Sequence, residues 1–310
     1  MRSVYYYTML ETLALLFALI ISIISPTGAN EIAAQAMLSA LPPQVHVVGV
    51  AAPFTVATSQ PRPSATRVPT QTARPNPTAT RTPTPKKPTP TPTPKKVVVK
   101  GHVYDAYIPA ATKKNQEFHY SCEFDAAWVV LKTNGFDVSV AQQAAIVGMS
   151  KGPEPYYKET KKGIFIYGGD ITTSFSGDYK KNFLARSTGQ AMRKVFEKYG
   201  LRVTPVNTRE GIQAALLRGE LVWIKTTVDF KAWKPATWVM PNGRTHKTVL
   251  GNDHAAVVMG FNKDVVVIRD VLGPTSTGKN RVYEYEVTWA KFMASWGAQS
   301  FDGLAVGKPR

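Results

Sequence analysis

A Pro- and Thr-rich stretch over residues 61–96 divides this 310-residue chain into parts with different physical properties. The stretch contains eleven Pro and ten Thr but no acidic residue, and it ends in TPTPKKPTPTPTPKK. Proline lacks the backbone N–H that helices and sheets require, and it biases the preceding residue towards extended geometry. Because apolar side chains are scarce, the stretch cannot bury a core. We predict a disordered, semi-rigid linker, at most about 110 Å long at ~3.1 Å per residue, whose composition can carry O-linked sugar.

Residues 1–29 have the layout of a secretory signal peptide. Arg2 supplies positive charge, residues 12–25 form an uncharged apolar run, and small residues at 27–29 offer a cleavage site. The alternative is an uncleaved membrane anchor, because the apolar span can be extended back to Val4, with Glu11 then inside it. Both alternatives predict that the rest of the chain is extracellular or at the cell surface. Residues 30–60 form a poorly patterned segment, without a clear hydrophobic periodicity, and they indicate no function.

The chain has a net charge of +17, and both its N-terminal part (residues 1–96) and its C-terminal part (residues 97–310) are basic. Residues 1–96 carry nine basic and two acidic residues, and residues 97–310 carry 29 and 19. This basic balance favours anionic partners such as a cell-surface polymer. The sequence has no RRM, zinc-finger or helix-turn-helix signature, so we expect no nucleic acid partner. A single cysteine excludes an internal disulfide and a multi-cysteine metal site, and we predict no metal and no cofactor.

Residues 97–310 are long enough to form one domain with a sizeable core. Apolar periodicity and turn residues predict helices over 121–134, 140–147, 189–199, 210–218 and 288–296. They predict strands over 97–107, 221–228, 254–261, 265–270, 281–286 and 303–306. Residues 152–177 have no clear period and are predicted to form a long loop. Helices followed by strands are typical of an α+β domain.

Cys122 is a candidate nucleophile. It lies in the first turn of a predicted helix, where unpaired N–H groups and the helix dipole favour a thiolate. The alternative is a buried cysteine that acts as a small apolar side chain. Gln116 lies six residues earlier, and its side-chain amide could donate to an oxyanion beside the backbone N–H of Cys122.

His254 and Asp270 are a candidate base and its orienting carboxylate. His254 begins one apolar strand, and Asp270 ends the next. A three-residue loop would pair Phe261 with Val265 and place His254 diagonally opposite Asp270 on the same face. A two-residue loop would put them on opposite faces. We rank Asp253 below Asp270 as the orienting carboxylate, because Asp253 would face the other side from His254 if the strand has already begun there.

Three segments resemble the C39-like branch of the papain-like cysteine peptidases. That family shows a Gln, six residues later a Cys that begins a helix ending at Gly, and later an Asp-His or Gly-His before a strand–turn–strand that ends in Asp. The corresponding segments are NQEFHYSCEFDAAWVVLKTNG, DHAAVVMGFNKDVVVIRDVLGP and TWAKFMASWGAQSFDGLAVG. The resemblance covers most of residues 100–308, but it leaves residues 150–185 unmatched.

The resemblance implies a papain-like fold, with the Cys on the N-terminal helices and the His and Asp on an antiparallel sheet. Cys122 would be the nucleophile, His254 the general base and then acid, Asp270 the orienter of the imidazole, and Gln116 part of the oxyanion hole. The implied reaction is acyl transfer to the thiol, then hydrolysis of the thioester. Glu123 stands where the family often has Gly, and it could oppose a thiolate or help to cap the helix.

Two functions remain open on the sequence alone. The first is an exported or surface-tethered cysteine peptidase or amidase that hydrolyses a peptide, such as a wall peptide. The second is a non-catalytic C39-like binding module, displayed on the Pro/Thr-rich stalk, that holds an anionic cell-surface polymer. In both cases we expect membrane contact only through the N-terminal segment.

Overall fold

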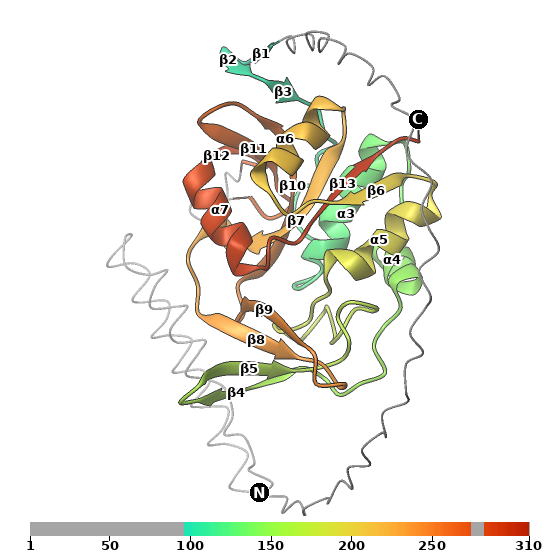
Figure 1. Ribbon diagram of the computed structural model, residues 1–310. Coiled ribbons are helices and arrows are strands. Elements are labelled where there is room, and N and C mark those ends of the chain that lie inside the picture. Colours follow the sequence, from blue (N-terminus) through green and yellow to red (C-terminus); the bar gives the residue numbers. More distant parts are fainter. Residues whose placement is uncertain (1–95, 274–281, 310) are drawn as a thin grey trace, which may run out of the picture. The chain divides into compact units, whose positions relative to one another are not determined.

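The computed structural model describes residues 96–273 and 282–309 (Figure 1). The predicted signal or anchor, residues 30–60 and the linker up to residue 95 lie outside the described residues. The helices are α3 (Cys122–Thr133), α4 (Val140–Val147), α5 (Gly189–Lys198), α6 (Arg209–Leu217), the short 3-10 helix η1 (Val228–Phe230) and α7 (Trp289–Ala298). No helix in these two ranges is both long enough and apolar enough to span a membrane.

The strands form three sheets. In chain order they are β1 (Val97–Val99), β2 (His102–Tyr104), β3 (Ala106–Tyr107), β4 (Tyr156–Thr160), β5 (Gly163–Tyr167), β6 (Arg202–Pro205), β7 (Leu221–Thr227), β8 (Pro235–Val239), β9 (Thr245–Val249), β10 (Asp253–Phe261), β11 (Val265–Arg269), β12 (Glu284–Thr288) and β13 (Gly303–Gly307). The main sheet is antiparallel with the order β12-β11-β10-β7-β13-β6, and β3 pairs with the end of β10.

Helices cover both faces of the main sheet, which explains why its central strands are continuous apolar runs. The odd-numbered residues Ala255, Val257 and Met259 of β10 share a core with α3, α4 and α5. The even-numbered residues Ala256 and Val258 share a second core with α6 and α7. In Figure 1 these two helix groups lie on opposite sides of β7 and β10. The α+β prediction is confirmed, and all five helices lie within two residues of their predicted bounds.

The prediction of a loop over residues 152–177 is wrong. Strands β4 and β5 form a hairpin there, and β5 pairs in parallel with β8, which pairs with β9. We call this four-stranded sheet the accessory sheet. Its small core includes Ile164, Ile166 and Trp238. Because β4 is almost entirely exposed, its sequence lacks the apolar alternation by which a strand is predicted. The strands β6, β8 and β9 are also absent from the prediction.

The predicted register of the β10–β11 hairpin is wrong at the turn and correct further along. Phe261 pairs with Val266 rather than Val265, and residues 262–265 separate the paired positions. A β-bulge between Val258 and Gly260 shifts the pairing by one residue. Beyond the bulge the predicted register returns. The bulge adds one residue to β10, and this extra residue cancels the one-residue shift at the turn. His254 and Asp270 therefore face the same side of the sheet, as predicted.

Candidate active site

A cleft of about 540 Å³ opens at the end of the main sheet where β10 begins. It is bordered by the loop before α3, by the first residue of α3, and by the segments that enter β10 and follow β11. Its lining residues are Asn115, Gln116, Glu117, Phe118, His119, Tyr120, Cys122, Phe183, Ala185, Val228, Asn252, Asp253, His254 and Leu272. Three of the four predicted site residues, Gln116, Cys122 and His254, therefore border one cleft.

Ser121 and Asp125 fix the loop that leads to Cys122. Ser121 Oγ donates to Asp125 Oδ2 at 2.6 Å, and it accepts the Phe118 N–H at 2.9 Å. Asp125 also accepts the Glu117 N–H at 3.2 Å. Ser121, the residue before α3, makes no side-chain cap to the helix backbone. It binds the loop to the first turn of α3 instead, and this places Cys122 at the edge of the cleft.

Gln116 uses its amide within the same loop. Its Nε2 donates to the backbone oxygens of Phe118 at 3.1 Å and His119 at 2.8 Å. An amide nitrogen has two hydrogens, so both are occupied in this conformation. To stabilise an oxyanion as predicted, Gln116 must release one of these carbonyls when substrate binds.

The Cys122 thiol lies against the residue that follows it. Cys122 Sγ donates to Glu123 Oε2 at 3.2 Å, and in the part of the chain that the structure describes it makes no hydrogen bond to His254. Burial raises the pKa of the Cys122 thiol, and the Glu123 carboxylate raises it further, whereas Lys225 acts in the opposite direction. The expectation that the helix N-terminus favours a thiolate is therefore wrong for this conformation: the protein holds a thiol.

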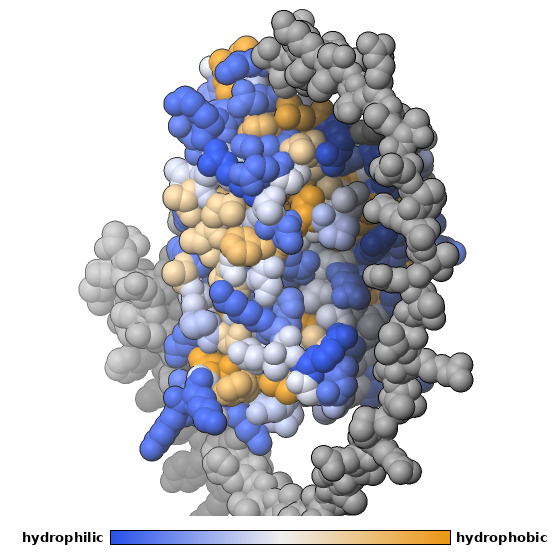
Figure 2. All heavy atoms as spheres, viewed as in Figure 1, coloured by the Kyte–Doolittle hydropathy of each residue, from blue (hydrophilic) through white to orange (hydrophobic). Residues whose placement is uncertain are grey.

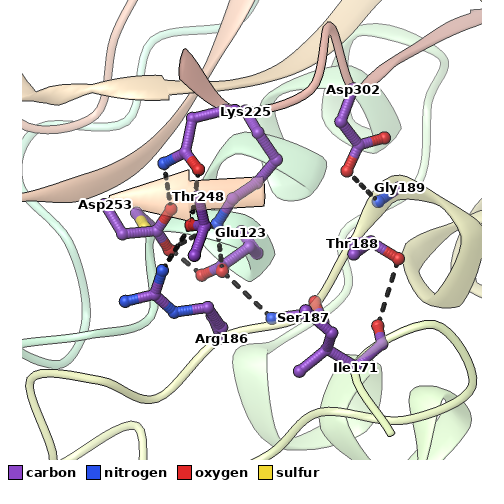
Figure 3. Close-up of polar contacts among 12 residues, drawn as sticks. Glu123, Ile171, Arg186, Ser187, Thr188, Gly189, Lys225, Thr248, Asp253 and Asp302 are labelled. Atoms are coloured by element: carbon purple, nitrogen blue, oxygen red, sulfur yellow. Dashed lines mark hydrogen bonds and ion pairs between the residues drawn. The ribbon is translucent and has the colours of Figure 1, made fainter. Parts of the chain in front are cut away.

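Glu123 belongs to a buried ionic network (Figure 3). Lys225 Nζ lies 2.5 Å from Glu123 Oε1 and 2.5 Å from Asp253 Oδ2, and the three side chains are at most 5% exposed. Gln299 Nε2 donates to Asp253 Oδ1 at 2.5 Å. Burial lowers the pKa of Lys225, but the two carboxylates outweigh it and raise this pKa. Glu123 thus neither caps α3 nor points to solvent, since it forms an ion pair with a cation from β7.

Arg186 extends this network to the accessory sheet. Arg186 Nη1 donates to Thr248 Oγ1 on β9 at 2.6 Å, and Thr248 donates to Gln299 Oε1 at 2.7 Å. The contacts from Arg186 to Asp253 therefore form one chain of hydrogen bonds, part of which is drawn in Figure 3. The thiol and the accessory sheet are therefore linked by a chain of polar groups whose side chains are largely buried.

Asp302 caps α5 beside this network (Figure 3). Its Oδ2 accepts the Gly189 N–H at 2.7 Å. Burial raises the pKa of Asp302 to about 6, against the hydrogen bond from Gly189 and the charge of Lys225, which lower it. This carboxyl is therefore half protonated at mildly acidic pH.

His254 and Asp270 form a buried pair on the other face of the sheet. His254 Nε2 lies 2.8 Å from Asp270 Oδ1, and Tyr285 Oη donates to Asp270 Oδ2 at 2.6 Å. Burial lowers the pKa of His254, but the Asp270 charge and hydrogen bond outweigh it and raise this pKa. Burial would raise the pKa of Asp270, but His254, Tyr285 and the Leu272 N–H hold it at about 2. Asp270 thus stays ionised and fixes the imidazole ring.

Asp253 with its ion pair and His254 with Asp270 approach the cleft from opposite faces of β10. Asp253 bonds to Lys225 and Gln299 on the α3 side, whereas His254 bonds to Asp270 on the other side. Nε2 is the His254 nitrogen that Asp270 holds, so Nδ1 is left for the cleft. A thiol–imidazole contact requires the Cys122 side chain to turn from Glu123 towards His254.

Several polar residues of the site, among them Lys225 and Tyr285, were not predicted from the sequence. Lys225 interrupts the apolar strand LVWIKTT, and a lysine in such a strand is a signal of a buried ion pair. Tyr285 lies in a predicted strand but carries no pattern that links it to Asp270. Among the described residues, no cluster of His, Cys, Asp and Glu side chains is arranged to hold a metal ion.

The fold and the cleft are those of a papain-like α+β protein, with a cysteine at a helix N-terminus and a His–Asp pair on the sheet. A profile of the Peptidase_C39 like family matches residues 107–304, and the chain belongs to this family. Comparison with curated proteins finds no match.

Solved structures that are similar to the chain include the following two. The first is a Bacillus anthracis protein described as a C39-like peptidase, with 17% identity and a TM-score of 0.51 over 69% of this chain and 98% of that one. The second is the peptidase domain of Streptococcus ComA, a bifunctional ABC transporter of a quorum-sensing pathway, with 12% identity and a TM-score of 0.34 over 64% of this chain and 98% of that one. The first likeness supports the papain-like fold and carries no information on substrate.

Proposed function

We propose that the protein is an exported or surface-tethered cysteine peptidase or amidase that acts through a Cys122 thioester. The observation that carries this proposal is the placement of Cys122 on the same cleft as His254, whose ring is fixed by Asp270 at 2.8 Å. A nucleophile, a base and an orienting carboxylate are the groups that acyl transfer by a thiol requires. Membership of the C39-like peptidase family supports the same chemistry.

The proposed reaction begins with movement of the thiol. Sγ leaves Glu123, and its proton passes to Nδ1 of His254, while Asp270 stabilises the imidazolium that forms. The thiolate attacks the substrate carbonyl, and the oxyanion is held by the N–H of Cys122, one of the orphan donors of the first helical turn. His254 then gives its proton to the leaving amine. Water, deprotonated by His254, hydrolyses the thioester and returns the thiol.

The cleft favours a peptide with a large apolar side chain near the scissile bond. Phe183 lines the cleft and is 37% exposed, and a Cβ added at Gly251 would lie 3.4 Å from its ring. Trp233, which is 43% exposed, lies near the same position and donates its indole N–H to Leu250 O at 2.5 Å. Exposed aromatic rings beside a catalytic centre are typical of side-chain subsites. A peptide of the cell wall is a separate candidate substrate for an exported enzyme, and its small and charged side chains would not use this subsite.

Hydrolysis by Cys122→Ser and Cys122→Ala variants tests the proposal. Wild-type protein should hydrolyse a mixed peptide library, and iodoacetamide should block that activity, because the chain has no other cysteine. Both variants should lose hydrolysis and keep the wild-type melting temperature within a few degrees. A Cys122→Ser variant as active as wild type would falsify the proposal. Export is tested separately by N-terminal sequencing of the mature protein, with a start near Asn30 expected for a cleaved signal.

The bond from Cys122 to Glu123 favours a second candidate, a non-catalytic C39-like binding module. In such a module the thiol would stay bound to Glu123, with its raised pKa, and would not turn to His254. Slow alkylation, no hydrolysis of any peptide and salt-sensitive binding to anionic wall material would favour this candidate over the peptidase.

A further inference from the structure

The accessory sheet has two faces of different composition. Ile164, Ile166, Ala236 and Trp238 point to its small core. Because side chains alternate along a strand, the residues between them lie on the opposite, outer face. This outer face carries aromatic, threonine and lysine side chains and no acidic residue.

The strand registers arrange the outer face in two rows that cross all four strands. One row consists of Lys158, Phe165, Thr237 and Lys247, and the next consists of Tyr156, Tyr167, Val239 and Thr245. The two lysines end the first row on the edge strands β4 and β9. With three inter-strand spacings between them, their Cα atoms are about 14 Å apart. The outer face is thus an aromatic strip with a cation at each side.

Tyr156 and Tyr167 form a platform within this strip. Their ring centroids are 5.3 Å apart with an interplanar angle of 20°, and Tyr156 is 42% exposed. Lys158 Nζ lies 5.9 Å from one ring centroid and 5.7 Å from the other. Among the described residues, neither tyrosine hydroxyl has a hydrogen-bond partner. Figure 2 shows apolar residues gathered at the lower end of the domain, where the accessory sheet lies, with hydrophilic residues on both sides.

The charge of the outer face indicates which class of partner it can bind. Neither row contains an acidic residue, so the outer face attracts anions. The Pro/Thr-rich linker of this chain would suit an aromatic surface, but it is basic and lacks acidic residues. A second copy of the same face is equally basic. Aromatic planes, hydroxyls and separated cations together match a polymer that has flat apolar ring faces, many hydroxyls and spaced negative charges.

We propose that the outer face of the accessory sheet binds an anionic polysaccharide, one that carries carboxylate or phosphate groups. The Tyr156 and Tyr167 rings stack against sugar rings, the lysines pair with the anionic groups, and the tyrosine and threonine hydroxyls bond to sugar hydroxyls. This binding does not depend on the peptidase activity, because no residue of the two rows lines the cleft.

Binding of the full chain to polygalacturonate at about 0.15 M salt tests the proposal. Tyr156→Ala with Tyr167→Ala should weaken binding about tenfold through lost stacking. Lys158→Ala with Lys247→Ala should weaken it by a similar factor and reduce its salt dependence. Lys114→Ala with Lys263→Ala removes the same charge away from the accessory sheet and should change little. Every variant keeps the same basic linker, so differences among them report on the sheet.

Three outcomes decide the question. Loss of binding in the tyrosine and lysine variants, but not in the control or in Cys122→Ser, supports the proposal. Equal binding by all variants overturns it. Tighter binding to oligo-dT or to anionic phospholipid vesicles than to polygalacturonate, with the same variants affected, also overturns it and assigns the face to nucleic acid or membrane.

Discussion

Replacing Glu123 by Gln should make Cys122 more reactive at neutral pH. Glu123 Oε2 lies 3.2 Å from Cys122 Sγ, and a unit charge at that distance disfavours a thiolate by about 5 kcal/mol at an effective dielectric constant of about 20. Lys225 lies 2.5 Å from the same carboxylate and offsets much of this repulsion. If about a quarter of this ~5 kcal/mol repulsion remains after the offset, Glu123→Gln should raise the thiolate population at neutral pH about tenfold.

Alkylation of Cys122 by iodoacetamide across about pH 6 to 10 measures this effect, since the thiolate is the reacting form. The chain has one cysteine, so the rate reports on a single site. The rate profile of Glu123→Gln should move to lower pH. Lys225→Gln removes the opposing cation and should move it to higher pH. Glu197→Gln is the matched control, because Glu197 pairs with Arg193 on the exposed surface of α5.

A Glu123→Gln profile that superimposes on that of wild type would refute the electrostatic reasoning. The variant also breaks one half of a buried ionic pair, which commonly costs about 3–5 kcal/mol. Alkylation must therefore be measured well below the melting temperature of each protein. A shift seen only where the variant is partly unfolded would contradict the assignment in the same way.

Three further predictions concern the buried carboxyls and the cleft. Asp270→Asn should lower the pH at which His254 titrates by NMR, and an unchanged titration would contradict the pairing. The stability from this pair should be greatest at intermediate pH. It falls towards the Asp270 pKa of about 2 and falls again as pH rises through the raised His254 pKa. Asp302, with its pKa of about 6, makes the folded state lose stability as pH rises from about 4 to 6. Across this range the melting temperature of Asp302→Asn should fall less than that of wild type. An equal fall in both proteins would contradict the raised pKa of Asp302. Phe183→Ala should lower kcat/KM about tenfold for peptides with a large apolar side chain, whereas Phe165→Ala, outside the cleft, should not; equal effects would remove Phe183 from the subsite.

Local signals made the helices predictable. Ser139 accepts the Gln142 N–H in a capping box, and Thr288 accepts the Lys291 N–H at the start of α7. Glycine follows α4 closely and ends the helix, as the sequence indicates. Such signals lie within a few residues of one another, so they are visible in a sequence without any knowledge of the fold.

Contacts between residues far apart in the sequence could not be predicted in this way. Cys122, His254 and Asp270 could be proposed because each lies at a predicted end of an element. The ion pair between Glu123 and Lys225 joins residues 102 positions apart, and no local pattern specifies it. As a result, the sequence suggests a thiolate at Cys122, whereas the structure surrounds the thiol with a network that opposes one.

The parallel pairing of β5 with β8 has a consequence for the order in which the protein folds. Ile164 pairs with Ala236 across α5, β6, α6 and β7, so closing this part of the accessory sheet costs more chain entropy than closing a hairpin. The β10–β11 hairpin, by contrast, joins neighbouring segments and can form early. Because Thr248 of β9 bonds to Gln299 and thus to Asp253, the surroundings of the thiol are complete only when the slow sheet is in place. In a refolding experiment, we expect native thiol reactivity to appear after most of the helical signal has already returned.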